Sequence, residues 1–186
     1  QAVSIELDEI YPEKIKQAVD IVVKTHDILR TIVRKVNGVM KLYIRNVEEK
    51  PLYSYLEEDI DKGRLDEIQE SFNLSNGPLF KVIVQRKEKR MIFIGHHLIV
   101  DAISWGIIIT DFLDAYNAVC SELVPVIQPP TTPFAAVADM ISDRIERGYY
   151  SNEKAYWYKN IKNIEPLLFS KNKSVLSFDV VGRKEF

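Results

Sequence analysis

The adjacent histidines at positions 96 and 97 are the side chains of this sequence best suited to acid–base chemistry. They lie in the segment from Gly95 to Trp105, which reads GHHLIVDAISW, and the chain has one further histidine. An imidazole exchanges protons readily near neutral pH because its unperturbed pKa is about 6.5. We expect a buried strand to end before this segment and a helix to begin after it, a junction that commonly presents side chains to ligands. His97 is therefore our candidate general base.

A structural role for the two histidines competes with the catalytic one. Adjacent histidines are often loop or core residues whose hydrogen bonds are satisfied, and the pattern alone leaves this interpretation open. Metal binding is disfavoured, because consecutive histidines rarely converge on one ion and the sequence has no companion His or Cys at ligand spacing. We therefore expect no metal site.

Asp101 and Ser104 each have two possible roles. Asp101 stands four residues after His97, directly before the expected helix, where its carboxylate can cap the helix N-terminus. It can equally pair with Arg30, whose charge would compensate a buried carboxylate and hold the shape of the loop. Ser104 could be a nucleophile, but no Gly-x-Ser-x-Gly turn surrounds it, and placement in the first helical turn is favoured.

The spacing of apolar residues predicts the elements that position this segment. Pro12 favours a helix start, and Asn37-Gly38 between two β-rich runs indicates a tight hairpin. The runs 79–84 and 91–94 are almost wholly apolar, which indicates strands covered on both faces at the centre of a sheet. The expected strands are 3–7, 31–36, 39–44, 52–56, 79–84, 91–94 and 175–181, and the expected helices are 12–26, 60–72, 105–116, 134–147 and 152–161.

Strands interleaved with helices predict an α/β fold, a two-layer sandwich that contains a mixed sheet. A chain of 186 residues is long enough for one sizeable core and too short to need two. We therefore expect a single domain, with the proline-containing stretch 121–133 as a connector within it. No glycine-rich turn joins a strand to a helix, which disfavours nucleotide binding.

Composition excludes several other classes of function. The formal charge is −2, from 25 basic and 27 acidic residues mixed along the chain, so no nucleic-acid or membrane-surface role is expected. The single cysteine, Cys120, cannot form an intramolecular disulfide and is expected to be a small buried hydrophobe. The opening residues lack the features of a secretion signal, and no apolar run approaches the roughly 18 residues that span a bilayer. We expect a cytoplasmic setting.

Three segments resemble a known family. His96 to Ala102 resembles the His-His-x-x-x-Asp-Gly signature of condensation-superfamily domains in nonribosomal peptide synthetases. Thr25 to Thr31, which reads THDILRT, is similar to the family's Arg-His-Glu-x-Leu-Arg-Thr segment, and Phe72 to Phe80, which reads FNLSNGPLF, is similar to its Phe-Asp-Leu-x-x-Gly-Pro-Leu segment. Their occurrence in family order makes coincidence improbable.

A second set of segments resembles the epimerisation subgroup of that superfamily. Val100 to Trp105 is similar to the Val-Asp-x-Val-Ser-Trp motif of epimerisation domains. The same subgroup is also matched by Thr131 to Phe134 and by Tyr156-Trp157. The resemblance covers essentially residues 1–186 and implies that they are the N-terminal half of a domain, with the C-terminal half expected to lie outside this sequence. It implies a chloramphenicol-acetyltransferase-like half-domain with its active site in a tunnel between the two halves.

The resemblance also implies a reaction. His97 would face the tunnel and, with a glutamate from the other half, exchange the Cα proton of an aminoacyl or peptidyl thioester. That thioester is carried on the phosphopantetheine of a peptidyl carrier protein, so no cofactor binds the chain directly. His96, Asp101, Arg30, Ser104 and Trp105 would support His97. The isolated half is expected to be inactive and, through its exposed apolar surface, to self-associate.

Departures from the family pattern keep other functions open. Ala102 replaces the signature glycine, which adds a methyl group or alters backbone freedom at the loop. Thr25 and Asn73 replace an arginine and an aspartate of the other segments. The alternatives are peptide-bond formation between two carrier-bound substrates, a module that docks a carrier protein without catalysis, and, more distantly, a coenzyme-A-dependent acyltransferase.

Overall fold

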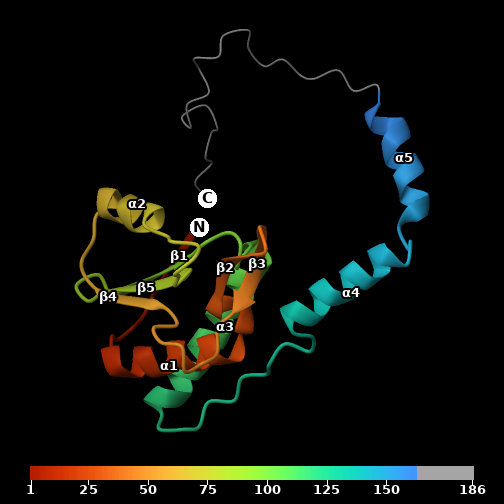
Figure 1. Ribbon diagram of the computed structural model, residues 1–186. Coiled ribbons are helices and arrows are strands. Elements are labelled where there is room, and N and C mark those ends of the chain that lie inside the picture. Colours follow the sequence, from red (N-terminus) through yellow and green to blue (C-terminus); the bar gives the residue numbers. More distant parts are fainter. Residues whose placement is uncertain (163–186) are drawn as a thin grey trace, which may run out of the picture. The chain divides into compact units, whose positions relative to one another are not determined.

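A computed structural model describes residues 1–162 of the protein (Figure 1). The chain divides into two compact units, the first of residues 1–137 and the second beginning at Ala138. Within the described residues, all the buried core side chains lie in the first unit, and so does the segment that carries the two histidines. The strand expected at Val175 to Val181 lies outside the described residues.

The first unit is built on a mixed four-stranded sheet in the order β1, β6, β5, β4. Its strands are β1 (Ala2–Glu6), β4 (Ser54–Glu57), β5 (Phe80–Gln85) and β6 (Arg90–Gly95). β6 runs antiparallel to both β1 and β5, whereas β4 runs parallel to β5. The predicted mixed sheet is therefore confirmed, and the hairpin of β5 and β6 forms its centre as expected.

Helices cover both faces of this sheet (Figure 1). The long helices α1 (Pro12–Thr25) and α3 (Ala102–Cys120) pack on the face that carries Val82, Val84 and Phe93. The shorter α2 (Lys62–Glu70) packs through Ile68 against Ile83, Ile92 and Ile94 on the opposite face. The α/β sandwich predicted from the sequence is confirmed for the sheet with α1 and α3, and α2 adds a short layer behind it. The side chains of β5 are buried along the whole strand, as its almost wholly apolar sequence predicts, and the buried set includes Lys81 and Gln85.

The helix α1 ends in a compact turn that leads into a separate hairpin. Pro12 is the first helical residue and His26 caps the C-terminus, after which one 3-10 turn, η1 (Asp27–Arg30), enters β2 (Thr31–Val36). β2 pairs antiparallel with β3 (Val39–Ile44) in a two-stranded sheet of its own. Asn37 and Gly38 at the tip both have positive φ, 51° and 81°, which confirms the predicted tight turn.

Helix boundaries differ from the predictions by a few residues for local reasons. α2 begins at Lys62 rather than residue 60, because the Asp61 side chain accepts the hydrogen bond of Arg64 N and so caps the helix. α3 begins at Ala102 rather than Trp105, because Asp101 caps it in the same way.

Beyond Cys120 the described chain has little buried surface. Residues 121–133 contain neither helix nor strand, and two helices follow, α4 (Phe134–Glu146) and α5 (Ser151–Ile161). Both helices agree with the expected ranges to within one residue at each end, and neither has a buried side chain. Within residues 1–162, no helix is both long enough and apolar enough to cross a membrane.

Candidate functional site

The segment from His96 to Val100 joins β6 to α3 and presents His97 at the surface. Ile99 and Val100 are buried, each 3% exposed, and pull the end of the loop into the core. The backbone is held by hydrogen bonds from His96 N to Leu79 O, at 3.0 Å, and from Ile99 N to His96 O, at 2.9 Å. His97, between these anchors, is exposed. The predicted position at a strand-to-helix junction is confirmed.

Gly95 is required where β6 meets this loop. A Cβ atom at that position would lie 2.6 Å from Cγ2 of Val100 and 3.2 Å from the indole ring of Trp105. Both neighbours are buried, so neither can move aside freely. The absence of a side chain at Gly95 therefore lets the first turn of α3 lie against the end of β6.

Gln1 links His97 to Trp105 across the start of the sheet. Its backbone pairs with Gly95, at 3.1 Å and 3.0 Å, and so extends the ladder between β1 and β6. The Trp105 indole donates from Nε1 to Gln1 Oε1 at 3.1 Å, and Gln1 Nε2 lies 2.9 Å from His97 Nε2. The indole itself is 6% exposed and packs against Phe80, with ring centroids 6.4 Å apart. Trp105 therefore contacts both Gln1 and the core.

Asp101 is the N-cap of α3. Its Oδ1 accepts the Ser104 N–H at 2.7 Å and the Ser104 Oγ–H at 2.6 Å. These two hydrogen bonds, the hydroxyl one foremost, hold the pKa of the Asp101 carboxyl below its usual value. The capping role and the first-turn position of Ser104 are confirmed. Ala102, the departure from the family signature, is exposed as the first residue of the helix.

Arg30 does not hold Asp101, and the predicted ion pair between them is wrong for the described structure. The Arg30 guanidinium instead donates from Nη1 to Val23 O, at 2.7 Å, and to Lys24 O, at 2.8 Å. Its Nε donates to Arg45 O at 3.0 Å. The last carbonyls of a helix lack partners within the helix and carry a partial negative charge, so a cation is favoured there. Arg30 fastens the end of α1 to the hairpin.

His96 is turned inward and has a structural role. Its Nδ1 accepts the Leu98 N–H at 3.1 Å, and its ring meets the edge of Phe72 with centroids 5.8 Å apart. Burial is the main cause that lowers the pKa of this imidazole, with smaller contributions from the charges of the first residue and of His97. A ring that is half-buried and favours its neutral form shapes the loop, and the two histidines divide into one structural and one accessible side chain.

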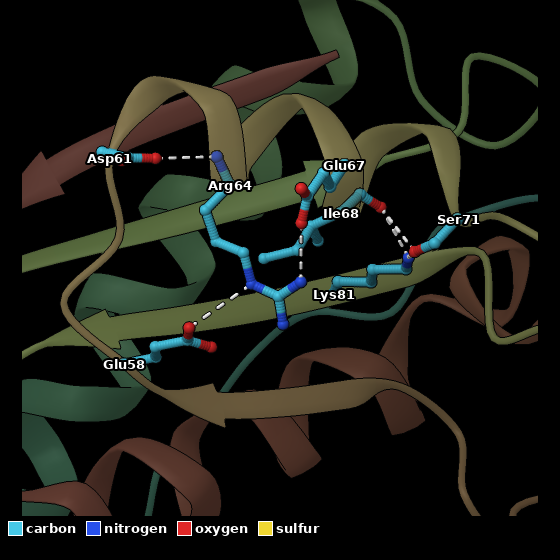
Figure 2. A network of polar contacts seen from close by, with 7 residues as sticks. All are labelled: Glu58, Asp61, Arg64, Glu67, Ile68, Ser71 and Lys81. Carbon is cyan, nitrogen blue, oxygen red and sulfur yellow. Dashed lines mark hydrogen bonds and ion pairs between the residues drawn. The ribbon is translucent and has the colours of Figure 1, made fainter.

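Lys81 is a buried charged side chain that the sequence analysis did not single out. Figure 2 shows it reaching from β5 to the C-terminal end of α2, where Nζ donates to Ile68 O at 2.7 Å and to Ser71 Oγ at 2.5 Å. The ammonium group also lies 4.2 Å from the centroid of the Phe72 ring. Burial lowers the pKa of Lys81. Lys81 thereby contacts Phe72, which in turn contacts His96. The sequence feature that could have predicted this role is a single lysine within an otherwise apolar predicted strand.

A second set of polar contacts, made by Arg64, lies on the exposed side of α2. Arg64 contacts Glu58 through Nε at 3.3 Å and Glu67 through Nη1 at 3.0 Å (Figure 2). All three side chains are largely exposed, so these ion pairs add little to stability. The buried contacts of Lys81 are therefore the ones that position α2.

A pocket of about 410 Å³ opens beside His97. It lies between the histidine loop, the turn after α1 and the start of α4, all within residues 1–137. The residues that line it are Asp27, Ile28, His97, Leu98, Ile99, Val100, Asp101, Ser104, Pro130, Thr132, Phe134 and Val137. Its wall is mainly apolar, with the imidazole and two carboxylates as charged or titratable groups. No group of three or more potential metal-ligating side chains occurs among the described residues.

The chain matches a known family along most of its length. The family model described as Condensation domain matches residues 1–177. The chain therefore belongs to the condensation domain family of nonribosomal peptide synthetases, as the family resemblance of the sequence implies. Bacitracin synthase 3 of Bacillus licheniformis is 28% identical over 158 residues, which make up 79% of this chain and 2% of that protein.

Two solved structures have the same fold. The epimerization domain from the third module of tyrocidine synthetase B aligns with a TM-score of 0.77 and 26% identity, over 89% of this chain and 40% of that one. The starter condensation domain of rhizomide synthetase aligns with a TM-score of 0.68 and 18% identity, over 86% of this chain and 41% of that one. The chain thus spans about two fifths of each solved domain and a small fraction of the curated relative.

Proposed function

We propose that this chain is the N-terminal half of an epimerisation domain, in which His97 exchanges the Cα proton of an aminoacyl or peptidyl thioester. The thioester would be held on the phosphopantetheine arm of a peptidyl carrier protein. The observation that carries the proposal is the exposed His97 imidazole on the wall of a mainly apolar pocket, beside the N-terminus of α3. The accessible imidazole is the group that a proton transfer needs.

The comparisons support epimerisation ahead of its relatives. The tyrocidine epimerization domain shares 26% of its aligned residues with this chain, whereas the starter condensation domain shares 18% and so supports the fold alone. The sequence from Val100 to Trp105, which resembles the motif of epimerisation domains, also supports epimerisation.

The proposed reaction needs only proton movements. His97 removes the proton from Cα, and the electron pair of the broken C–H bond delocalises into the thioester carbonyl. An acid on the opposite face, supplied by the other half of the domain, then returns a proton to Cα, and His97 gives up its proton. The configuration is inverted, no electron leaves the substrate, and no oxidant is needed.

The pocket has the dimensions and lining that a slender acyl arm requires. Its volume of about 410 Å³ falls in the range of small-molecule sites. Leu98, Ile99 and Val137 offer apolar contacts to the methylene groups of the arm, and Thr132 offers a hydroxyl to its amides. The residues that line the pocket include no Lys or Arg, and in the proposed complex the Cα–H of the thioester faces the His97 imidazole.

The test is Cα hydrogen exchange in the complete parent synthetase. A carrier domain loaded with one L-amino acid is incubated in heavy water, and deuterium at Cα and the D to L ratio are measured. We expect exchange and inversion in the wild type, and a loss of about 100-fold or more in His97→Gln. Lys41→Ala, at an exposed position of β3, is the matched control and should leave the rate unchanged. Full exchange in His97→Gln would refute the proposal.

Peptide-bond formation is the second candidate, favoured by the fold shared with the starter condensation domain. There His97 would position or deprotonate the acceptor amine as it attacks the donor thioester. Adding a second loaded carrier to the same assay separates the two functions: amide formation without Cα exchange identifies condensation. Neither product in the wild type would leave the chain as a carrier-docking module.

A further inference from the structure

We infer that Gln1 is a positioning residue for His97: its carboxamide, oriented by the Trp105 indole, fixes the imidazole with its hydrogen on Nδ1 and its lone pair on Nε2. The inference rests on the proposed function for its catalytic meaning, whereas its structural content stands on contacts alone. Those contacts are the 3.1 Å hydrogen bond from Trp105 Nε1 to Gln1 Oε1 and the 2.9 Å separation of Gln1 Nε2 from His97 Nε2.

The Trp105 indole fixes the orientation of the Gln1 carboxamide, that is, which of Oε1 and Nε2 faces His97. An indole N–H is a donor only, so the atom that receives it must be the amide oxygen. Trp105 is 6% exposed and is held in place by the packing of its ring against Phe80. The donor direction of Nε1 is therefore fixed by the core. With Oε1 taken by Trp105, the amide nitrogen of Gln1 is the atom that points at His97.

The carboxamide in turn decides the tautomer of His97. An amide nitrogen donates and does not accept, so the His97 Nε2 that faces it must accept. A neutral imidazole carries one hydrogen, and with Nε2 as acceptor that hydrogen lies on Nδ1. The backbone N–H and C=O of Gln1 are both hydrogen-bonded to Gly95, so the backbone that carries the carboxamide is held against β6.

The other two histidines of the chain are held in the opposite tautomer. His96 accepts the Leu98 N–H at Nδ1, so its hydrogen lies on Nε2. His26 places Nε2 2.6 Å from a carboxylate oxygen of Asp111, and an ionised carboxylate only accepts, so Nε2 again carries hydrogen. Among the three, His97 alone should have its lone pair on Nε2. This contrast gives an internal reference within a single spectrum.

For catalysis, the Gln1 N–H marks the place of the proton that His97 removes. The donor that lies 2.9 Å from Nε2 occupies the hydrogen-bonding position that a substrate C–H or N–H would need in order to give its proton to this nitrogen. Substrate has to replace this weak, exposed donor, and afterwards the carboxamide restores the ring to its starting tautomer. The partner of the basic nitrogen is thus an exposed amide and not a buried group that would compete strongly for it.

The test is the imidazole ¹⁵N spectrum of the purified chain at about pH 8.5, some two units above the ordinary histidine pKa, where neutral rings dominate. The chain is expressed with a residue before Gln1, so that its carboxamide cannot cyclise onto a free amine. We expect two rings with hydrogen on Nε2, His96 and His26, and one with hydrogen on Nδ1, His97. Gln1→Glu offers only acceptors and should move His97 to the Nε2–H form, while Gln1→Ala should leave a mixture.

Gln17→Glu is the matched control, since it adds the same charge at an exposed position of α1 and should leave all three rings unchanged. Trp105→Phe removes the donor that orients the Gln1 carboxamide and should give a mixture at His97. Because that variant also alters packing, the Gln1 variants decide the test. A wild-type His97 with its hydrogen on Nε2, or a His97 signal that is the same in wild type and Gln1→Ala, would overturn the inference.

The catalytic part is tested separately in the parent synthetase. Gln1→Ala should lower the rate of Cα exchange by about 10- to 100-fold with little change in KM, because orientation and tautomer of the base are lost while the binding surface remains. If the tautomers are as inferred but no variant of the parent exchanges Cα hydrogen, the proposed function fails and the structural inference stands. If exchange depends on His97 but is the same in Gln1→Ala, the positioning role is refuted.

Discussion

The imidazole Nε2 of His26 lies 2.6 Å from Oδ2 of Asp111, and this contact joins the C-terminal end of α1 to the middle of α3. Both side chains are largely shielded, with 11% and 21% of their surface exposed. α3 is also the helix whose N-terminus, beside His97, is capped by Asp101. His26 therefore has a polar partner 85 positions away in the sequence.

Breaking this pair should destabilise the fold. His26→Ala or Asp111→Ala removes a charge-assisted hydrogen bond and leaves one polar group shielded without it, which costs about 1–3 kcal/mol. The two losses should be strongly non-additive in the double variant, because the second substitution removes a group that has already lost its partner. Urea unfolding of the four chains measures the coupling. Additive losses would show that the contact contributes nothing specific.

Gly95→Ala should strain the histidine loop. The new methyl group would lie 2.6 Å from Val100 Cγ2 and 3.2 Å from the Trp105 ring, and overpacking of this kind costs about 1–3 kcal/mol. A methyl group at Gly106 in α3 would have nothing within 4 Å, so Gly106→Ala is a matched control that should be neutral or stabilising. Thermal unfolding compares the two. An equal melting temperature for Gly95→Ala and wild type would mean that the backbone yields without cost.

The layered fold could be predicted from the sequence because periodicity reports burial directly. The almost wholly apolar runs of β5 and β6 predicted the centre of the sheet, and Asn37-Gly38 predicted the hairpin of β2 and β3. Periodicity does not report which strands become neighbours, so the parallel pairing of β4 with β5 and the placement of α2 behind the sheet were not anticipated. Those features depend on contacts between segments far apart in the chain.

The candidate site could be predicted in part, for a similar reason. The position of His97 and the capping role of Asp101 follow from neighbours within a few residues. Arg30 was assigned to Asp101 because charge patterns show possible partners and hide the carbonyl groups at the end of α1, which are the acceptors it contacts. The bridge from Gln1 to His97 spans 96 positions, and no local pattern contains it.

The cap of α3 should stabilise the chain in a pH-dependent manner. Hydrogen bonds from Ser104 lower the pKa of Asp101, so the folded chain favours the carboxylate, and the stabilisation is present above the unfolded pKa of about 3.9. It is lost as the pH falls through the lower folded value. Asp101→Ala should therefore melt below wild type at pH 7, and the difference should shrink below about pH 4. Asp66→Ala, at an exposed position of α2, is the control and should show no such trend.

Lys81→Met should destabilise the chain by about 1–3 kcal/mol, because Ile68 O and Ser71 Oγ lose their donor while the apolar stem over Phe72 is kept. Lys41→Met, at an exposed position of β3, removes the same charge without these contacts and should cost little. Urea unfolding at pH 8 measures the stability of both variants. Equal stabilities of Lys81→Met and wild type would show that Lys81 does not stabilise the position of α2.

The same lysine should give the wild type a rising stability at alkaline pH. Burial lowers the pKa of Lys81 below its ordinary value of 10.5, so the folded chain binds fewer protons than the unfolded chain in the interval between the two values. Where the unfolded state binds more protons, stability increases with pH. A neutral amine still has two N–H groups, enough for Ile68 O and Ser71 Oγ, so the contacts persist. The gap between wild type and Lys81→Met should widen as the pH approaches 10.5, and a constant gap would show that the amine remains charged in the fold.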